Sequence, residues 1–381
     1  MNDLNVAYSV YSWLPVTMNW IYTQIKYLEG FTPLILSDST ENLDKLPDYP
    51  AISIRNRQMR FLLTNLRKAG VRLIPAAYHS AIQMHHPAIL HSHFGDRGWY
   101  DLPMAKKYGL KQIVTFYGYD LSLLPRSRPV WRTRYHQLFE SAARFLCEGP
   151  HMAQTLVDLG CPQAKVTVQR LGVDLDQIPF MPRKLDDTGE IGILIAGRFV
   201  EKKGIPYALE AIGLLKDQFP CLRVTIIGDS AGSRREEQEK ARILEMIRLY
   251  RLESIITMLG FQPFDVLMRE IYKNHIFLSP SVTASNGDTE GGAPVTITQA
   301  LASGMPVVST THCDIPAVVS HAVSGLLSEE RDANGLAIQL QWLIEHPEHW
   351  PVMAEAGRKH IEAEFDARLQ GQYLGNIYKE L

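Results

Sequence analysis

The chain has 381 residues, of which 46% are hydrophobic and 21% charged, and its formal net charge is −2. This composition is typical of a globular protein and excludes a disordered one, and the length predicts two domains. A net charge near zero gives no general support for nucleic-acid binding, and no apolar run approaches the ~18 residues of a membrane-spanning helix. Four cysteines without a CxxC pair indicate reduced thiols, and the first residues lack a signal-peptide pattern, so we expect a cytoplasmic protein.

Short apolar runs alternate with longer amphipathic stretches along the chain. In the first half we expect strands at 5–11, 33–36, 89–92 and 112–116 and a helix at 20–28. In the second half we expect strands at 191–196, 223–228, 255–259, 276–279 and 306–309 and helices at 207–216 and 235–250. Alternating strands and helices predict parallel sheets covered on both faces.

The alternation occurs twice, so the predicted fold is α/β with two Rossmann-like, doubly wound domains. We place the first at 1–178, joined by a C-terminal helix at 365–381, and the second at 188–364. The proline-containing segment 174–187 is the expected linker. Two such domains are expected to face a deep cleft, with ligands at the carboxyl ends of the strands.

Charge is unevenly distributed between the halves. Residues 1–180 carry 19 Lys and Arg against 14 Asp and Glu, and the stretch 55–72 contains six basic residues and no acid. A second basic run at 126–134 surrounds Trp131. Such surfaces can lie on anionic membranes, so a peripheral contact at the inner face of the cytoplasmic membrane is one interpretation. The other is an ordinary solvated helix face.

The most informative segment runs from Asp288 to Thr310. Its glycine pair, Gly291 and Gly292, precedes Pro294, which suits the first position of a helix. The glycines leave backbone N–H groups and the positive helix end free for an anion such as a diphosphate. Glu290 before them can hold a hydroxylated ligand. The alternative is a purely structural turn.

A second loop, Gly197 to Gly204, follows the strand predicted at 191–196. Its Arg198 and Lys203 are placed to neutralise a diphosphate at the strand end, whereas the plain alternative is a charged surface loop. His93 and the segment containing Tyr117 and Asp120 also follow strands.

Other motifs argue against metal or dinucleotide chemistry. Asp174 and Asp176 formally match an Asp-x-Asp metal motif, but two linker acids without a third ligand make a poor site. A G-x-G-x-x-G fingerprint opening a helix is absent. We therefore predict no metal site.

These motifs resemble those of the retaining glycosyltransferases of family 4, which have the GT-B fold. The loop 197–204 is similar to that family's Gly-Arg-x-x-x-x-Lys-Gly loop, and 290–299 to its paired-glutamate motif. Segments at 91–95, 115–120, 171–174 and 312–316 are also similar. Residues 12–25 resemble the N-terminal loop and helix of the subgroup that builds exopolysaccharides and colanic-acid-type polymers.

The resemblance implies a role for each matching residue. Arg198, Lys203 and Glu290 would be catalytic, the first two on the donor diphosphate and the third on the transferred sugar. The implied donor-binding residues are Gly197, Gly228, Phe261, Gly291, Gly292, Ala293, Pro294, Val295 and Gln299. The implied acceptor or sugar contacts are Trp13, His93, Tyr117 and Asp120.

The chain departs from the family at three points. Gln299 stands where the family usually has Glu, the spacing from Glu290 is one residue longer, and Tyr117 replaces a histidine. A glutamine keeps one carbonyl acceptor but loses the charge and the second oxygen. Tyrosine still donates a hydrogen bond but does not readily carry positive charge.

The expected function is metal-independent transfer of a sugar, with retained configuration, from a nucleotide-diphosphate donor to a hydroxyl. By resemblance the donor is a UDP-hexose and the acceptor a lipid-linked or growing polysaccharide; no cofactor and no nucleic-acid partner is expected. Three alternatives stay open: a small soluble acceptor, a non-catalytic nucleotide-sugar-binding subunit, and an epimerase of the same fold.

Overall fold

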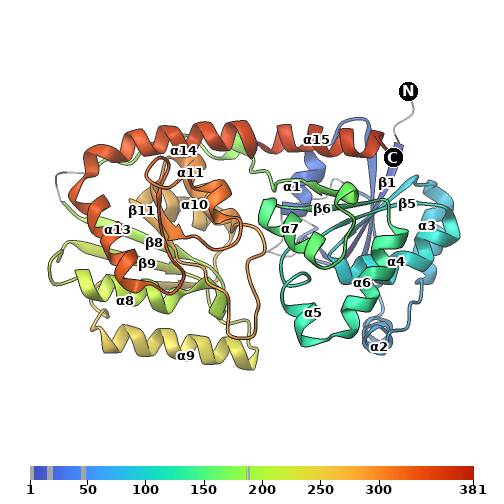
Figure 1. Cartoon of the computed structure of the whole chain (residues 1–381), viewed down its shortest axis with the longest axis horizontal. Helices are drawn as coiled ribbons and strands as arrows, with labels where there is room; N and C mark the ends of the chain where they lie inside the picture. Colours follow the sequence, from blue (N-terminus) through green and yellow to red (C-terminus); the bar gives the residue numbers. More distant parts are fainter. Residues whose placement is uncertain (1–3, 15–19, 44–48, 186, 188) are drawn as a thin grey trace. The chain divides into compact units, whose positions relative to one another are not determined.

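The computed structural model describes residues 4–14, 20–43, 49–185, 187 and 189–381 (Figure 1). The chain divides into two compact units. Unit 1 consists of Met1–Gly172 and Ala367–Leu381, and unit 2 of Val173–Asp366. Among the described residues, no helix is both long and apolar enough to cross a membrane.

Unit 1 is built on a parallel sheet of seven strands. The strands are β1 (Leu4–Trp13), β2 (Phe31–Thr40), β3 (Ala51–Ser53), β4 (Ile89–His93), β5 (Lys111–Thr115), β6 (Arg144–Cys147) and β7 (Val166–Val168). Their order is β3-β2-β1-β4-β5-β6-β7, with Tyr8 of β1 paired to Ile35 of β2 and His91 of β4. The order changes direction at β1 and β4, where a ligand crevice is expected in such sheets.

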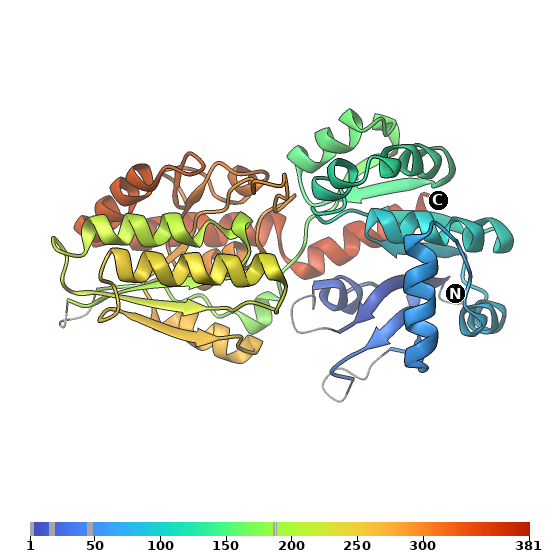
Figure 2. The same cartoon turned by 90° about the horizontal axis from the view of Figure 1, so that it is seen from below.

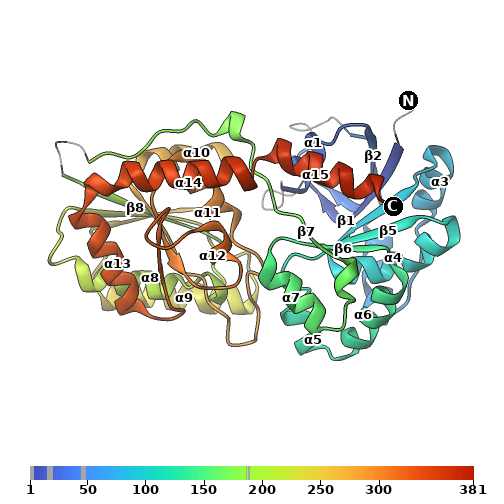
Figure 3. The same ribbon diagram turned by 45° about the horizontal axis from the view of Figure 1, so that its top comes forward.

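The helices of unit 1 lie on both faces of this sheet. They are α1 (Trp20–Lys26), α2 (Arg57–Lys68), α3 (Ala76–His85), α4 (Gly95–Tyr108), α5 (Leu123–Ser127), α6 (Val130–Ser141), α7 (Pro150–Asp158), the 3-10 turn η1 (Gln163–Lys165) and α15 (Ala367–Lys379). The end of the chain returns to this unit, where α15 packs against α1 (Figure 3). The approach is close: a Cβ added at Gly371 would lie 2.4 Å from the carbonyl oxygen of Tyr27.

Unit 2 has a parallel sheet of six strands. Its elements are η2 (Leu175–Gln177), β8 (Ile191–Ala196), η3 (Glu201–Lys203), α8 (Ile205–Leu215), β9 (Leu222–Ile227), α9 (Arg234–Leu249), β10 (Ile256–Gly260), α10 (Phe264–Lys273), β11 (Ile276–Ser279), α11 (Val295–Ser303), β12 (Val307–Thr310), α12 (Ile315–Val318), β13 (Leu326–Ser328), α13 (Ala333–Glu345), η4 (Pro347–His349) and α14 (Trp350–Glu364). The strand order is β10-β9-β8-β11-β12-β13. On one side of this sheet α8 and α9 pack side by side (Figure 2).

The central strand β8 explains why unit 2 is covered on both faces. Successive side chains of a strand point to opposite faces of the sheet. Ile193 and Ile195 belong to the core cluster that contains residues of α8 and α13, whereas Leu194 and Ala196 belong to the cluster that contains residues of α11. A strand that is apolar at every position is therefore what a doubly wound sheet requires.

The segment expected as a linker is largely part of unit 2. Arg183 is buried, and its guanidinium donates to the carbonyl oxygens of Ile271 at 2.6 Å and Asn274 at 3.0 Å. Asp174 caps η2 by accepting from the backbone N–H of Asp176 and from the Gln177 side chain. Asp174 of this acidic pair therefore serves as a helix cap.

Candidate functional site

The carboxyl ends of β8 and β9 meet without side chains between them. Gly228 has a φ of +138°, and a Cβ at this position would lie 1.9 Å from the carbonyl oxygen of Gly197. The N–H of Gly197 bonds to the carbonyl of Ile227 at 2.9 Å. Only glycine at position 228 permits this approach, while Gly197 contributes its backbone carbonyl and N–H to the contact.

Arg198 follows directly and is oriented by an acid. Its Nε lies 2.9 Å from Oε1 of Glu236, whose side chain is almost buried, while the arginine side chain is 52% exposed. Glu236 also completes the capping box of α9 with Ser233. Among the described residues, the two terminal nitrogens of Arg198 have no protein partner, so this face of the guanidinium is available for a bidentate anion.

Lys203 and Glu290 form the central pair of the site, although 87 residues separate them in sequence. The Nζ of Lys203 lies 2.9 Å from Oε1 of Glu290, which also accepts from the Ser281 hydroxyl at 3.1 Å. The Glu290 side chain is mostly buried. Burial acts to raise its pKa, but the nearby ammonium groups of Lys203 and Lys202 more than offset this, so the pKa lies below its ordinary value.

The neighbouring Lys202 fixes the same loop by different contacts. Its Nζ lies 3.3 Å from the Asp288 carboxylate and donates to the carbonyl oxygen of Thr289 at 2.8 Å. Its backbone carbonyl accepts from Val282. The two lysines of η3 therefore bind consecutive parts of the 288–290 loop, Lys202 through Asp288 and the Thr289 carbonyl and Lys203 through Glu290.

His312 holds the Glu290 loop from the other side. Its Nε2 accepts from the backbone N–H of Glu290 at 3.1 Å, and its Nδ1 contacts Glu330 Oε1 at 2.5 Å. Glu330 in turn accepts from the backbone N–H of Thr283 at 2.7 Å. The sequence predicted only a family-like segment at 312–316; the available signal for a site residue was a histidine two positions after an apolar strand.

The glycine loop leads into α11 one residue later than expected. Gly291 has a φ of +79°, and Pro294, with a ψ of 127°, precedes the first helical residue, Val295. Ala293 and Val295 pack against the core, which anchors the start of the helix. Because α11 follows β11 in a parallel sheet, its positive end lies at the carboxyl edge of that sheet.

Two further predicted donor-binding residues lie in segments that follow strands of this sheet. Gln299 is partly buried in the second turn of α11, and no hydrogen bond of its side chain occurs within the described part of the chain. Phe261 directly follows β10 and is half exposed. Both side chains are thus available for a ligand, and no contact joins them to the Lys203–Glu290 pair among the described residues.

In unit 1, His93 and Tyr117 form a second cluster at the ends of β4 and β5. The His93 Nδ1 lies 2.6 Å from the Tyr117 hydroxyl, and their rings stack at 5.9 Å. Burial and the nearby His91 hold the pKa of His93 well below its usual value, so the ring is neutral. Its buried Nε2 has no partner among the described groups, a feature that often marks a ligand or water contact.

Asp120 organises the backbone around this cluster. Its carboxylate accepts from the backbone N–H groups of Gly95 at 2.8 Å, Tyr117 at 3.0 Å and Gly118 at 2.9 Å. Burial raises its pKa to about 7 despite these three donors. The geometry therefore gives Asp120 a positioning role for the loop that carries Tyr117.

Trp13, and Trp131 of the second basic run, are buried and do not form an exposed surface for a ligand. Trp13 is 2% exposed and packs in the core beside Tyr22, and the following residues 15–19 lie outside the described ranges. Trp131 is buried as well, with the Arg134 guanidinium 4.7 Å from its ring centre. Trp131, the aromatic residue of the 126–134 run, is therefore part of the core and not of an exposed amphipathic face.

Comparison with known proteins agrees with this architecture. The family model described as "Glycosyltransferase Family 4" matches residues 29–177, and "Glycosyl transferases group 1" matches 177–360. The chain is 33% identical over 298 residues to the putative colanic acid biosynthesis glycosyltransferase WcaL of Salmonella typhimurium, covering 76% of this chain and 70% of that protein.

Two other relatives match a slightly smaller part of this chain. WcaL of Escherichia coli and the amylovoran biosynthesis glycosyltransferase AmsK of Erwinia amylovora are each 34% identical over 276 residues, which is 71% of this chain. The matched region spans 64% of the length of each of these two proteins.

Solved structures show the same fold at low identity. Anabaena HepE in complex with UDP and glucose superposes with a TM-score of 0.79 at 15% identity, over 99% of this chain and 100% of that one. Sucrose-phosphate synthase from Thermosynechococcus elongatus gives 0.77 at 18% identity, over 99% and 98%.

Proposed function

The chain belongs to the family 4 glycosyltransferases of GT-B fold, and from this premise we propose that it transfers a hexose from a nucleoside diphosphate to a hydroxyl of a polysaccharide or lipid-linked acceptor. The observation that carries the proposal is the Lys203–Glu290 pair beside the glycine loop of α11, together with the oriented guanidinium of Arg198. These groups match a ligand that joins a diphosphate to a hydroxylated ring.

The leaving diphosphate is the part of the reaction that this site is best suited to assist. Negative charge grows on the phosphate as the glycosidic bond breaks, and preorganised donors aimed at that charge lower the barrier. Arg198 offers its terminal nitrogens. Lys203 has three N–H donors and uses one on Glu290. The backbone N–H groups at the start of α11 add further donors.

The charge balance of the site shapes this proposal. Arg198 is paired with Glu236 and Lys203 with Glu290, so neither is an isolated positive charge. Stabilisation of the leaving group would therefore come from oriented hydrogen bonds more than from net charge. We expect these donors to suffice without a divalent metal, and we expect retention by same-face attack, in which the leaving phosphate takes the acceptor proton.

Glu290 would bind the hydroxyl groups of the transferred sugar. Its pKa lies below the ordinary value, so it is a carboxylate at neutral pH and accepts hydrogen bonds. The contacts from Lys203, Ser281 and His312 fix both its side chain and its backbone. UDP is the donor nucleotide we propose, since HepE, which shares the fold, is named as a complex with UDP.

The acceptor side is proposed from unit 1. The polysaccharide class follows from the relatives, which are named for colanic acid and amylovoran biosynthesis. Tyr117 and the unpartnered His93 Nε2 are the polar groups proposed to contact a sugar.

A basic, apolar face on α2 favours contact with an anionic bilayer, which would bring a lipid-linked acceptor to the enzyme. Phe61 is 70% exposed and Leu62 50%, and the exposed cations Arg57 and Lys68 lie on the same helix. Arg67 is excluded from this face because it pairs with Asp38. A helix that carries exposed aromatic and aliphatic groups together with exposed cations is typical of interfacial helices.

The test of the donor proposal is a thermal-shift panel of nucleoside diphosphates and nucleotide-sugars with EDTA present. Stabilisation by UDP and UDP-hexoses supports both the donor class and metal independence. Stabilisation by GDP alone would show that the donor nucleotide carries guanine and not uracil. Binding only after added Mn²⁺ would contradict metal independence. Binding of the donor without any turnover would favour a non-catalytic subunit.

The membrane contact has its own test. Wild-type protein is expected to float with vesicles rich in phosphatidylglycerol and not with neutral vesicles, and a Phe61→Ser/Leu62→Ser variant is expected to lose this. Equal flotation of wild type and variant would refute the role of α2.

A further inference from the structure

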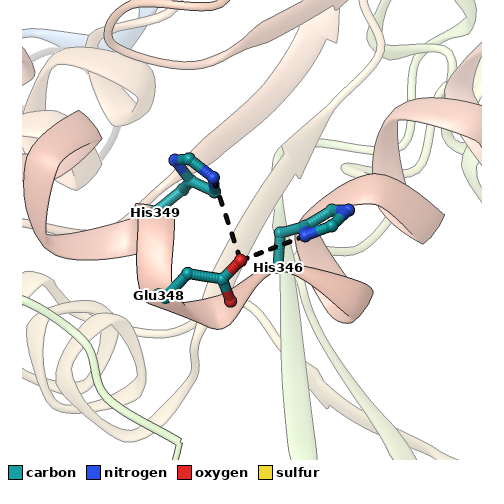
Figure 4. Close-up of side chains that lie close together, drawn as sticks. All are labelled: His346, Glu348 and His349. Carbon is teal, nitrogen blue, oxygen red and sulfur yellow. Dashed lines mark hydrogen bonds and ion pairs between the residues drawn. The ribbon is translucent and has the colours of Figure 1, made fainter.

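A cluster of ligand-type side chains lies at the junction of α13 and α14. His346 directly follows α13, and Glu348 and His349 belong to η4 (Figure 4). The Nδ1 of His346 lies 3.1 Å from Oε1 of Glu348, and the Nε2 of His349 lies 3.8 Å from the same oxygen. We call these three residues the η4 cluster.

The tight turn explains why these side chains converge. A 3-10 turn has three residues per turn, so side chains at positions i and i+3 lie above one another. His346 and His349 have this spacing, and Pro347 between them sets the backbone for the turn. Figure 4 shows both imidazoles directed toward the Glu348 carboxylate between them.

The separations suit a single metal ion. One ligand atom from each residue lies within 4.8 Å of the other two. Zinc–imidazole bonds are about 2.0–2.1 Å long, so two ligand atoms on one tetrahedral ion lie about 3.3 Å apart. The cluster therefore needs only small side-chain rotations, and its exposed position permits them.

We propose that the η4 cluster binds one divalent transition-metal ion such as Zn²⁺ through two imidazole nitrogens and one carboxylate oxygen. Imidazole favours zinc, copper and nickel, whereas Mg²⁺ prefers a shell of oxygen atoms. Three protein ligands leave a fourth position for water or another ligand. The ion would link the end of α13 to the start of α14.

The neighbouring Trp342 packs against both histidines of the η4 cluster and allows metal binding to be detected by fluorescence. The ring of Trp342 lies 5.0 Å from that of His346 and 5.1 Å from that of His349. One aromatic residue thus supports both imidazoles. Its indole is also close enough for its fluorescence to respond when Ni²⁺ or Cu²⁺ occupies the cluster.

The η4 cluster lies at the opposite edge of the sheet from the donor residues. In a parallel α/β sheet, a helix returns the chain from the carboxyl edge to the amino edge, so α13 ends at the amino edge. His275, which precedes β11, lies 5.6 Å from the ring of Trp350 at the start of α14. Metal binding at this cluster is therefore independent of the proposed transfer reaction.

Calorimetric titration of the 381-residue chain with ZnCl₂ tests the proposal. We expect one equivalent bound per chain, loss of that equivalent in a His346→Ala/His349→Ala variant, and at least tenfold weaker binding in Glu348→Gln. His85→Ala is the matched control, because it removes an imidazole from α3 and should keep the wild-type equivalent. MgCl₂ should give no binding at the cluster.

Two results would overturn the proposal. One is the absence of Zn²⁺ binding to the wild type, and the other is an unchanged equivalent in the double variant. The circular dichroism spectrum and the affinity for UDP should be the same in the double variant as in the wild type. Failure of the metal proposal can therefore be told apart from failure of the transferase proposal. As a second readout, Ni²⁺ should quench the wild type more than a Trp342→Phe variant.

Discussion

Replacement of Lys203 by methionine tests the electrostatic core of the site. The change removes the ammonium 2.9 Å from Glu290, whose side chain is 8% exposed, and keeps most of the apolar stem. Breaking a fully buried pair costs about 3–5 kcal/mol. Because Lys203 is one-fifth exposed, we expect a loss of about 2 kcal/mol in the free energy of unfolding at neutral pH.

The same change should slow turnover much more than it weakens the fold. Loss of one preorganised donor to developing charge lowers kcat by about 10²–10³-fold. The assay is release of UDP from a UDP-hexose, with and without acceptor. Lys202→Met is the matched control, because this neighbour in η3 binds Asp288 and the Thr289 carbonyl. Its expected effect on kcat is about tenfold or less.

The pH dependence gives an independent signature. In the wild type the pKa of Glu290 is depressed, so its contribution to stability is present above the unfolded-state pKa and is lost as pH falls through the folded-state pKa. Without Lys203, burial dominates and the folded-state pKa rises, so the carboxyl destabilises the variant as pH rises. The Tm difference between wild type and variant should therefore shrink toward pH 4. Equal kcat in both lysine variants, or a Tm difference independent of pH, would refute the reasoning.

Three more variants probe neighbouring features. Gly228→Ala should unfold unit 2 or lower its stability by more than about 3 kcal/mol in urea denaturation, because the new Cβ meets the Gly197 carbonyl; near wild-type stability would contradict the close approach. Glu236→Ala should release Arg198 and the α9 cap, weakening UDP binding about tenfold by calorimetry and costing about 1 kcal/mol; unchanged affinity would remove its positioning role. Gln299→Glu should lower the donor KM several-fold in steady-state kinetics if this position binds ribose hydroxyls, and an unchanged KM would argue against that contact.

The sheets were predictable because buried parallel strands are continuously apolar. The predicted bounds of β8 and β11 agree with the structure, and other predicted strands differ by one or more residues at their ends. The strands β3, β6, β7 and β13 were missed. Each has only three or four residues, so none carries a long apolar run that stands out in the sequence.

The site was predictable as separate loops but not as a set of contacts. Glycine and lysine patterns located Lys203 and the 290–294 loop, yet the pairing of Lys203 with Glu290 depends on how β8 and β11 lie side by side. His312 was not singled out because its role requires Glu330 and the Glu290 backbone together. Side-chain pairs brought together by tertiary structure leave no local pattern in sequence.

Burial also decided between interpretations of similar basic runs. The runs at 55–72 and 126–134 both mix arginines with apolar residues. In the first, Phe61 and Leu62 are exposed, whereas in the second Trp131 is buried. The sequence alone did not distinguish the two runs, because a helix with exposed apolar residues and one with buried apolar residues have the same composition.

Calorimetric titration of UDP into the wild type and an Arg198→Ala/Lys203→Ala variant, both in EDTA, tests the central claim most directly. The proposed donor site predicts metal-independent binding of one UDP per chain and at least 100-fold weaker binding in the variant. Equal affinities, or no binding of UDP to the wild type, would contradict a donor diphosphate site built on these two residues.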